Sequence, residues 1–335
     1  MNITRENFFD YASGNPFVEC CGDLENMVIR NPHTPSFYAL AERSVVSNTK
    51  ELISEMFGCE TDEIIFTSGA SESNALALQT PFECSDFCHA SIKENPNKVE
   101  YSPYKAVSLV DGYMGMLHSV TNATHIDITQ GIQEFVNHYK FNELPCCETI
   151  AFSGSKIGAL QGIGVLIVRR DVKRHLKPLI YGKQQDGLRG GTLNVLGIES
   201  LYHALLKVKG GYKDKEEIIN ANQKLKLFQL GVNVYEAMNI LLLDLSNAEY
   251  LKGHDSETIM HDMELNANVI CGIGSACDGK SKNTIYEKYF GKDYKILRFS
   301  IDRYYEDMKA MKERAIDRII AELERIKSEN GKKEM

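Results

Sequence analysis

The chain has 335 residues and a formal net charge of -8 at pH 7. Its length exceeds that of a usual single domain, so we expect one large domain with a smaller one attached. The negative charge and the lack of a block of Lys and Arg argue against a nucleic-acid surface, because phosphate binding needs clustered cations.

The first residues, Met1 to Glu6, lack the apolar stretch of a signal peptide, and no run approaches the ~20 apolar residues of a membrane span. We therefore expect a cytoplasmic protein. Its nine cysteines lie at irregular positions that fit neither a disulfide framework nor a zinc site. Cys84, Cys88 and His89 lie close enough to suggest a metal, but without a second ligand pair we favour ordinary buried residues and expect no metal.

The first predicted element is a long amphipathic helix between Ser36 and Phe57, where apolar residues recur at helical spacing before Gly58. A short apolar strand follows over Ile64 to Thr67, then a turn at Ser68-Gly69-Ala70 and a helix from Ser71 to Gln79. A strand, a glycine turn and a helix in this order are the local structure of an anion site.

Further short β-rich segments alternate with stretches too long for simple hairpins: Ala106 to Val110, Thr124 to Ile128, Thr149 to Ser153 and Ile163 to Val168. This alternation favours an α/β core with a mainly parallel sheet. After a helical stretch near Leu193 to Val208, a second set of elements begins with an apolar strand at Ile240 to Leu245 and ends in a helix from about Glu306 to Lys327. This set predicts a smaller α/β domain, and we expect the tail after Ser328 to be frayed.

Lys156 follows the predicted strand end at Ser153 and is surrounded by serine and glycine residues. A lysine that forms a Schiff base needs such an open and well-positioned site, although a solvated loop lysine fits the same pattern.

Asp127 lies inside an apolar strand, where an unpaired buried carboxylate would cost several kcal/mol. It should therefore have a cationic partner. A protonated pyridine nitrogen is one such partner, because an aspartate beside it keeps the ring of pyridoxal 5'-phosphate (PLP) an effective electron sink. A structural ion pair with Arg or Lys is the alternative.

Cys277 lies in the glycine-rich segment Gly272 to Gly279, which offers a thiolate nucleophile both exposure and reach. About twenty residues later, Arg298 lies in the apolar strand Ile296 to Ser300, where its planar guanidinium would suit a substrate carboxylate.

These segments occur in an order that resembles the cysteine desulfurases of the NifS/IscS group, within the class V aminotransferase family of fold-type I PLP enzymes. The resemblance extends from Phe9-Asp10-Tyr11-Ala12 through Phe66 to Asn74 and on to Arg298-Phe299-Ser300. Its most specific motifs are Gly187 to Asn194 and Gly274-Ser275-Ala276-Cys277.

The resemblance implies a fold-type I PLP-dependent transferase, with a mainly parallel sheet flanked by helices and a smaller C-terminal α/β domain. We expect residues 14–208 to form the large PLP-binding domain. Residues 1–13 and 209–335 are expected to form the small domain that carries the catalytic cysteine loop. The implied partners are a second copy of the chain, free cysteine and a protein that accepts sulfur.

The resemblance also implies the site residues. Lys156 would hold the cofactor and act as acid and base, His89 would stack on the pyridine ring and shuttle a proton, and Cys277 would take sulfur from cysteine as a persulfide. Arg298 would bind the cysteine carboxylate. The remaining implied contacts to PLP come from Asp127 at the ring nitrogen, Gln130 at the phenolic oxygen, Gly69, Ala70, Ser71, Ser153 and Ser155 at the phosphate, and Thr192 at the phosphate of the neighbouring subunit.

The chain departs from the family pattern at three positions. Ser155 stands where the family has a histidine, Gly112 where it has an asparagine that contacts the cofactor oxygen, and Asp186 where an arginine is usual. The region between His89 and Lys156 is also shorter than expected. Lys156, Asp127, His89, Cys277 and Arg298 are all retained.

Three functions are consistent with the sequence. The first is a cysteine desulfurase that serves iron-sulfur cluster assembly or thiolation. The second is other PLP chemistry on a small amino acid, such as selenocysteine lyase or aminotransferase activity. The third is a non-catalytic subunit that docks a sulfur-transfer partner. The products of a desulfurase would be alanine and a persulfide on Cys277, so substitution of Cys277 separates the first two functions.

Overall fold

The structure, a computed structural model, describes residues 2–18, 29–274 and 283–333. The chain forms two units, one from Asn15–Asp111 and Leu117–Gly211 and the other from Met1–Gly14, Gly112–Met116 and Tyr212–Met335. The assignment of PLP binding to the larger unit and of the catalytic cysteine loop to the smaller one stays a prediction.

The larger unit contains a six-stranded sheet with the strand order β1-β6-β5-β4-β3-β2. Its strands are β1 (Ile64–Thr67), β2 (Glu83–Cys84), β3 (Lys105–Ser108), β4 (His125–Asp127), β5 (Thr149–Ser153) and β6 (Gly164–Val168). Strands β2 to β5 pair in parallel, and β6 runs antiparallel to both β5 and β1. The predicted α/β class with a mainly parallel sheet is confirmed.

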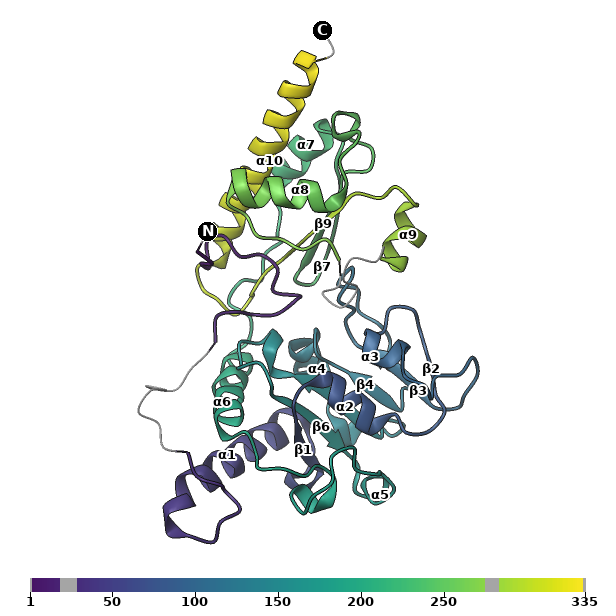
Figure 1. Ribbon diagram of the computed structural model, residues 1–335, viewed down its shortest axis with the longest axis vertical. Coiled ribbons are helices and arrows are strands. Elements are labelled where there is room, and N and C mark those ends of the chain that lie inside the picture. The colour runs from purple at the N-terminus through teal and green to yellow at the C-terminus, as the bar shows by residue number, and fades with distance from the viewer. Residues whose placement is uncertain (1, 19–28, 275–282, 334–335) are drawn as a thin grey trace. The chain divides into compact units, whose positions relative to one another are not determined.

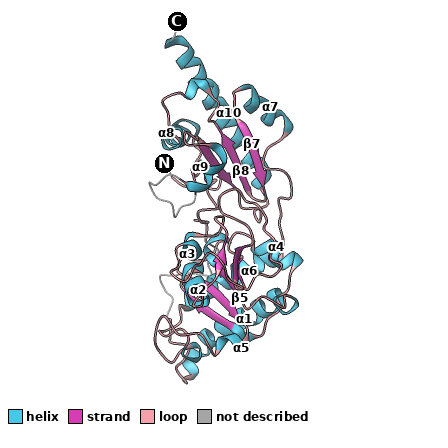
Figure 2. Ribbon diagram, turned by 90° about the vertical axis from the view of Figure 1, so that its right-hand side faces the viewer, coloured by secondary structure: helices cyan, strands magenta, loops and turns pink. Residues whose placement is uncertain are grey.

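Helices flank this sheet (Figures 1 and 2). They are α1 (Leu40–Phe57), α2 (Ala70–Ala77), α3 (Ala90–Lys93), α4 (Ile132–His138), α5 (Arg170–Lys173) and α6 (Val195–Lys209). Helix α1 packs beside α6 and ends at Gly58, which adopts a left-handed conformation with a φ of 70°. The helix was predicted to end here. Glycine favours such an end because it has no Cβ that would clash in the left-handed conformation.

The two faces of the sheet carry different helices because successive side chains of a strand point to opposite sides. Phe152 of β5 stacks on Phe57 of α1, with the ring centroids 5.2 Å apart. On the other face, Leu76 of α2 packs against Ile65 and Leu166. Asp127 is paired in register with Ala151, and Ala151 with Leu166, so Asp127 lies on the face covered by α2.

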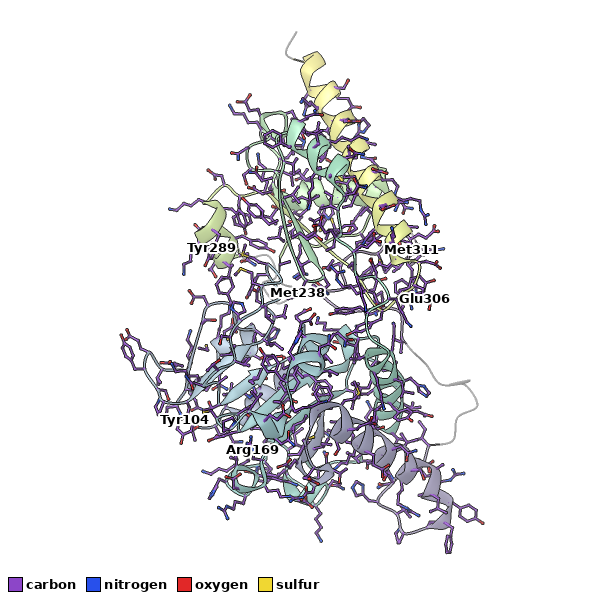
Figure 3. The ribbon with its side chains drawn as sticks, turned by 180° about the vertical axis from the view of Figure 1, so that it is seen from behind. Tyr104, Arg169, Met238, Tyr289, Glu306 and Met311 are labelled. Carbon is purple, nitrogen blue, oxygen red and sulfur yellow. The ribbon has the colours of Figure 1, made fainter. Side chains whose placement is uncertain are left out.

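The loop after β6 is held by Arg169, which is labelled in Figure 3. Its guanidinium donates to the carbonyl oxygens of Phe141, Leu144 and Cys147. It also lies over the ring of Phe141, 4.7 Å from the centroid. These contacts fix the start of α5 against the segment that precedes β5.

The smaller unit has a three-stranded antiparallel sheet with the order β7-β8-β9. Its elements are α7 (Ala221–Gln229), β7 (Asn233–Ala237), β8 (Ile240–Asp244), α8 (Ser256–Asp262), α9 (Thr284–Phe290), β9 (Ile296–Ser300) and α10 (Met308–Lys333). Phe9 donates its amide to the carbonyl of Ile270 and accepts from the amide of Ser300, at 2.7 Å in each case. The N-terminal segment is therefore bonded to residues near the far end of the sequence.

Helix α10 continues to Lys333, so the prediction of a frayed end after Ser328 was wrong. Two contacts explain the extension. Arg325 pairs with Glu329 one turn later at 2.6 Å, and the side-chain amide of Asn330 donates to the carbonyl of Tyr250 at 2.8 Å. Such a pair one turn apart stabilises a helix, and the second contact ties its last turn to the unit.

No helix among the residues that the structure describes is long and apolar enough to cross a membrane.

Candidate active site

The predicted cofactor residues gather where the parallel strands of the larger unit end. Asp127 is the last residue of β4, and Ser153 is the last residue of β5, directly before the short 3₁₀ turn Gly154–Lys156. His89 precedes α3, and its amide donates to the hydroxyl of Ser108 at the end of β3. Carboxyl ends of parallel strands are the usual ligand-binding edge of an open α/β sheet.

Asp127 is 4% exposed and accepts two hydrogen bonds. One comes from the side-chain amide of Asn74 and the other from the backbone amide of Thr129, both at 2.9 Å. Within the described residues, these two neutral groups hold the carboxylate, and no Lys or Arg forms an ion pair with it. A buried carboxylate held only by neutral donors is suited to a cation brought by a ligand, which fits the protonated nitrogen of a pyridine ring.

The neighbouring buried histidine does not supply that cation. His125 is fully enclosed, and its burial lowers its pKa to about 4, although the Asp127 carboxylate opposes this shift. It is therefore neutral near pH 7 and cannot neutralise Asp127.

The turn after β1 forms a hydroxyl-rich cradle at the start of α2. Gly69 precedes α2, Ala70 begins it and Ser71 is exposed. A Cβ added to Gly164 of β6 would lie 2.5 Å from the backbone of Gly69, so this turn lies directly on the sheet. Amides at the start of a helix bind phosphate, which fits the expected role of this turn.

Ser153 and Ser155 extend the cradle on the β5 side, with their hydroxyl oxygens 3.0 Å apart. Lys156 and Gln130 are half-buried in the same unit, and Thr192 is exposed. Lys156 follows one strand end and Asp127 another, and these strands are neighbours. The residues thus provide an amine, a carboxylate and hydroxyl groups, which together fit PLP.

Arg298 lies in β9 of the smaller unit and is 1% exposed. Its guanidinium pairs with Asp10 at 2.8 Å and also donates to Ser13 and to the carbonyl of Gly112. Its Nε is buried and has no hydrogen-bond partner among the described residues. To bind a substrate carboxylate as predicted, Arg298 would have to use its Nε, or the substrate carboxylate would have to replace that of Asp10 in the ion pair.

Cys277 lies outside the described residues. Asp186, which stands where the family has an arginine, pairs with Lys173 at 2.7 Å.

Cys88 is buried and Cys84 is partly buried, and the described residues contain no group of three or more His, Cys, Asp or Glu side chains that could hold a metal.

Three residues of this region received no role from the sequence: Asn74, Ser91 and His125. Each is a polar residue in a helix or strand, and its own sequence segment does not show which residues it contacts. Their hydrogen bonds to one another and to Asp127 form only where α2, α3 and β4 meet in the fold.

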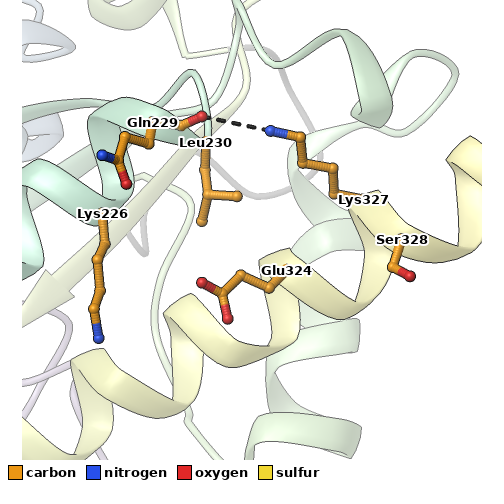
Figure 4. A pocket seen from close by; sticks show the side chains of 6 residues that line it. All are labelled: Lys226, Gln229, Leu230, Glu324, Lys327 and Ser328. Atoms are coloured by element: carbon orange, nitrogen blue, oxygen red, sulfur yellow. Dashed lines mark hydrogen bonds between the residues drawn. The ribbon is translucent and has the colours of Figure 1, made fainter.

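A pocket of about 430 Å³ lies elsewhere, between α7 and α10 of the smaller unit (Figure 4). It is lined by Lys226, Gln229, Leu230, Glu324, Lys327 and Ser328. None of the predicted site residues lines it.

Comparison with known proteins places these features in context. The family model for aminotransferase class-V matches residues 106–308. The cysteine desulfurase IscS of Rickettsia typhi is 25% identical over 250 residues, which cover 57% of this chain and 59% of that protein. The chain thus spans less than two thirds of the length of such relatives. A mitosomal cysteine desulfurase of Encephalitozoon cuniculi is 27% identical over 344 residues, covering 83% of this chain and 77% of that protein.

A solved structure described as a NifS-like protein has a TM-score of 0.72 and 17% identity, and the match covers 96% of this chain and 98% of that one. At this identity the likeness concerns the fold, and it confirms the predicted fold-type I architecture.

Proposed function

Because the chain belongs to the aminotransferase class-V family, we propose that it is a PLP-dependent cysteine desulfurase that converts cysteine to alanine and passes the sulfur to Cys277 as a persulfide. The observation that carries the proposal is Asp127, a buried carboxylate without a Lys or Arg partner in the described part of the chain, beside the strand that leads to Lys156. The likeness to curated cysteine desulfurases supports the choice of substrate.

When bound, PLP would act as an electron sink for charge that develops at the substrate α-carbon. Asp127 would keep the proton on the pyridine nitrogen. Gln130 would donate to the phenolic oxygen, and Gly69, Ala70, Ser71, Ser153 and Ser155 would hold the phosphate. These contacts fix the orientation of the ring before any substrate arrives.

Lys156 would hold the cofactor and, once displaced by the substrate amine, would move a proton at the substrate carbons. His89 would stack on the ring and exchange a further proton. Arg298 would bind the substrate carboxylate. The Cys277 thiolate would attack the substrate sulfur, so that a new S–S bond forms as the C–S bond breaks and alanine is released.

We also propose a homodimer in which Thr192 reaches the phosphate of the neighbouring subunit. Thr192 is exposed, and the nearby apolar run Leu179, Ile180 and Tyr181 is 48%, 42% and 84% exposed. Exposed apolar runs of this kind suit a subunit interface. Light scattering after size exclusion should give twice the chain mass, and Ile180→Asp should shift the population toward the monomer. A monomeric wild type would contradict this part of the proposal.

The test of the reaction uses purified protein supplied with PLP, cysteine and a thiol reductant. We expect a visible absorbance band that is lost in Lys156→Ala, together with release of alanine and sulfide. Cys277→Ala should abolish sulfide release, whereas the matched variant Cys146→Ala, which removes an exposed thiol, should not. A protein that stays colourless with PLP and makes no alanine would contradict the proposal and favour a docking role without catalysis. Alanine formation that survives Cys277→Ala would instead favour a lyase.

A further inference from the structure

A hydrogen-bond chain, buried at Asp127 and partly buried at His89, links these two residues across three elements of the larger unit. The side-chain amide nitrogen of Asn74, in α2, lies 2.9 Å from Asp127 Oδ2 and 2.9 Å from Ser91 Oγ. Ser91 Oγ lies 2.8 Å from Nδ1 of His89. The chain therefore joins the residue proposed to hold the pyridine nitrogen to the residue proposed to stack on the ring.

The direction of the first bond is fixed by charge. A carboxylate can only accept hydrogen bonds, so the atom of Asn74 that faces Asp127 must be its NH₂ group. The other hydrogen of that group then points to Ser91 Oγ, which accepts it. Asn74 Oδ1 faces Nε2 of His125 at 2.9 Å, and that nitrogen donates to it.

The far side of His125 agrees with this assignment. Since burial keeps His125 neutral, its Nδ1 is an acceptor when Nε2 carries the proton. The hydroxyl of Thr149, 2.8 Å from Nδ1, donates to it. His125 therefore holds the carbonyl oxygen of Asn74, while Asp127 and Ser91 hold its NH₂ group, and the side-chain amide has one orientation.

The direction of the last bond is set by the backbone amide of Ser91, which donates to Nδ1 of His89 at 3.2 Å. An Nδ1 that accepts from this amide carries no hydrogen, so the hydroxyl of Ser91, which accepts from Asn74, donates its own hydrogen to the same nitrogen. Nδ1 of His89 thus receives two donors and carries no proton, so the neutral ring holds its proton on Nε2.

We infer that Asn74 and Ser91 are positioning residues that transmit the orientation of the Asp127 carboxylate to His89 and hold its imidazole as the Nε2–H tautomer. Nε2 is then the atom through which His89 exchanges a proton. The catalytic consequence rests on the proposed function, whereas the tautomer does not.

The test measures the tautomer of His89 directly in the 335-residue chain, with and without added PLP. Two-bond proton–nitrogen correlation spectra of protein labelled with ¹⁵N-histidine distinguish the tautomers, and the signal missing in His89→Gln assigns the ring. We expect Nε2–H in the wild type. Ser91→Ala removes one donor to Nδ1 and should raise the ratio of Nδ1–H to Nε2–H by roughly five- to tenfold, the effect of about one net hydrogen bond.

Three further variants define the result. Ser91→Thr keeps the hydroxyl and should restore the wild-type ratio. Asn74→Asp accepts where the amide donates, so it should turn the Ser91 hydroxyl away from His89 and shift the ratio in the same direction as Ser91→Ala. Ser119→Ala removes an exposed hydroxyl that takes no part in these hydrogen bonds and should leave the tautomer ratio of His89 unchanged.

Activity provides the second readout. In Ser91→Ala, kcat for alanine formation should fall several-fold with little change in KM for cysteine, and Ser91→Thr should restore it. If the wild type makes no alanine, the proposed function fails while the tautomer still tests the hydrogen-bond chain. If the wild type makes alanine but His89 holds its proton on Nδ1, or if Ser91→Ala leaves the ratio unchanged, the inference is overturned.

Discussion

Replacing His125 with glutamine should reduce the acid sensitivity of the fold. Burial lowers the pKa of His125 from 6.5 to about 4. Between these values the unfolded chain binds a proton that the folded chain does not, so stability rises with pH across this window and is lost as the pH falls below 6.5. At 1.36 kcal/mol per pH unit, the loss amounts to about 3 kcal/mol at pH 4.

His125→Gln removes this titration and keeps an amide that can donate to Asn74. The variant should be less stable than the wild type near pH 7, because the bond to Thr149 is disturbed, but the two should converge as the pH falls toward 4. Urea unfolding of the cofactor-free protein, followed by circular dichroism because the chain has no tryptophan, measures both curves. His203→Gln, at an exposed histidine, is the matched control. Parallel curves for wild type and His125→Gln, or a His125 resonance that titrates near 6.5, would refute the reasoning.

Three further substitutions test the packing. Gly164→Ala places a Cβ 2.5 Å from the backbone of Gly69 and should weaken PLP binding about tenfold or more, measured by titrating the visible absorbance; unchanged affinity would contradict the phosphate cradle. Lys312 and Asp214 form an ion pair in which both side chains are 1% exposed. Lys312→Met leaves Asp214 as an unpaired buried charge and should lower the free energy of unfolding by about 3 kcal/mol, and adding Asp214→Leu should restore part of this loss. Gly58→Ala forces a side chain into a left-handed φ of 70° and should cost about 1 kcal/mol in the same urea assay, whereas no loss would mean that the helix end adjusts.

The sequence predicted those elements whose own residues determine them. Helix α1 has a clear amphipathic period and a glycine at its end, and β1, β5 and β8 are short apolar runs. Strands β2 and β7 were not predicted, because neither is buried enough to give an apolar run. Their pairing with neighbouring strands stabilises them, and pairing is a tertiary property that local propensity does not report.

The same distinction holds for the site. Lys156 and Asp127 could be proposed from local sequence, since one follows a strand in a glycine-rich turn and the other is a charge in an apolar strand. The hydrogen bonds of Asn74, Ser91 and His125 could not be proposed in this way. They join residues from separate elements, and their direction depends on which atom donates in each bond. The environment of Arg298 was also unexpected, since Asp10 lies 288 positions away in the sequence.

The bonds that Phe9 makes to Ile270 and Ser300 have a consequence for the order in which the protein forms on the ribosome. The residues of the larger unit end at Gly211, so it can fold while the rest of the chain is still being translated. The smaller unit needs both the first residues of the chain and β9, and it therefore waits until Ser300 has left the exit tunnel. Until then the backbone groups of Phe9 lack the two partners that they have in the folded unit.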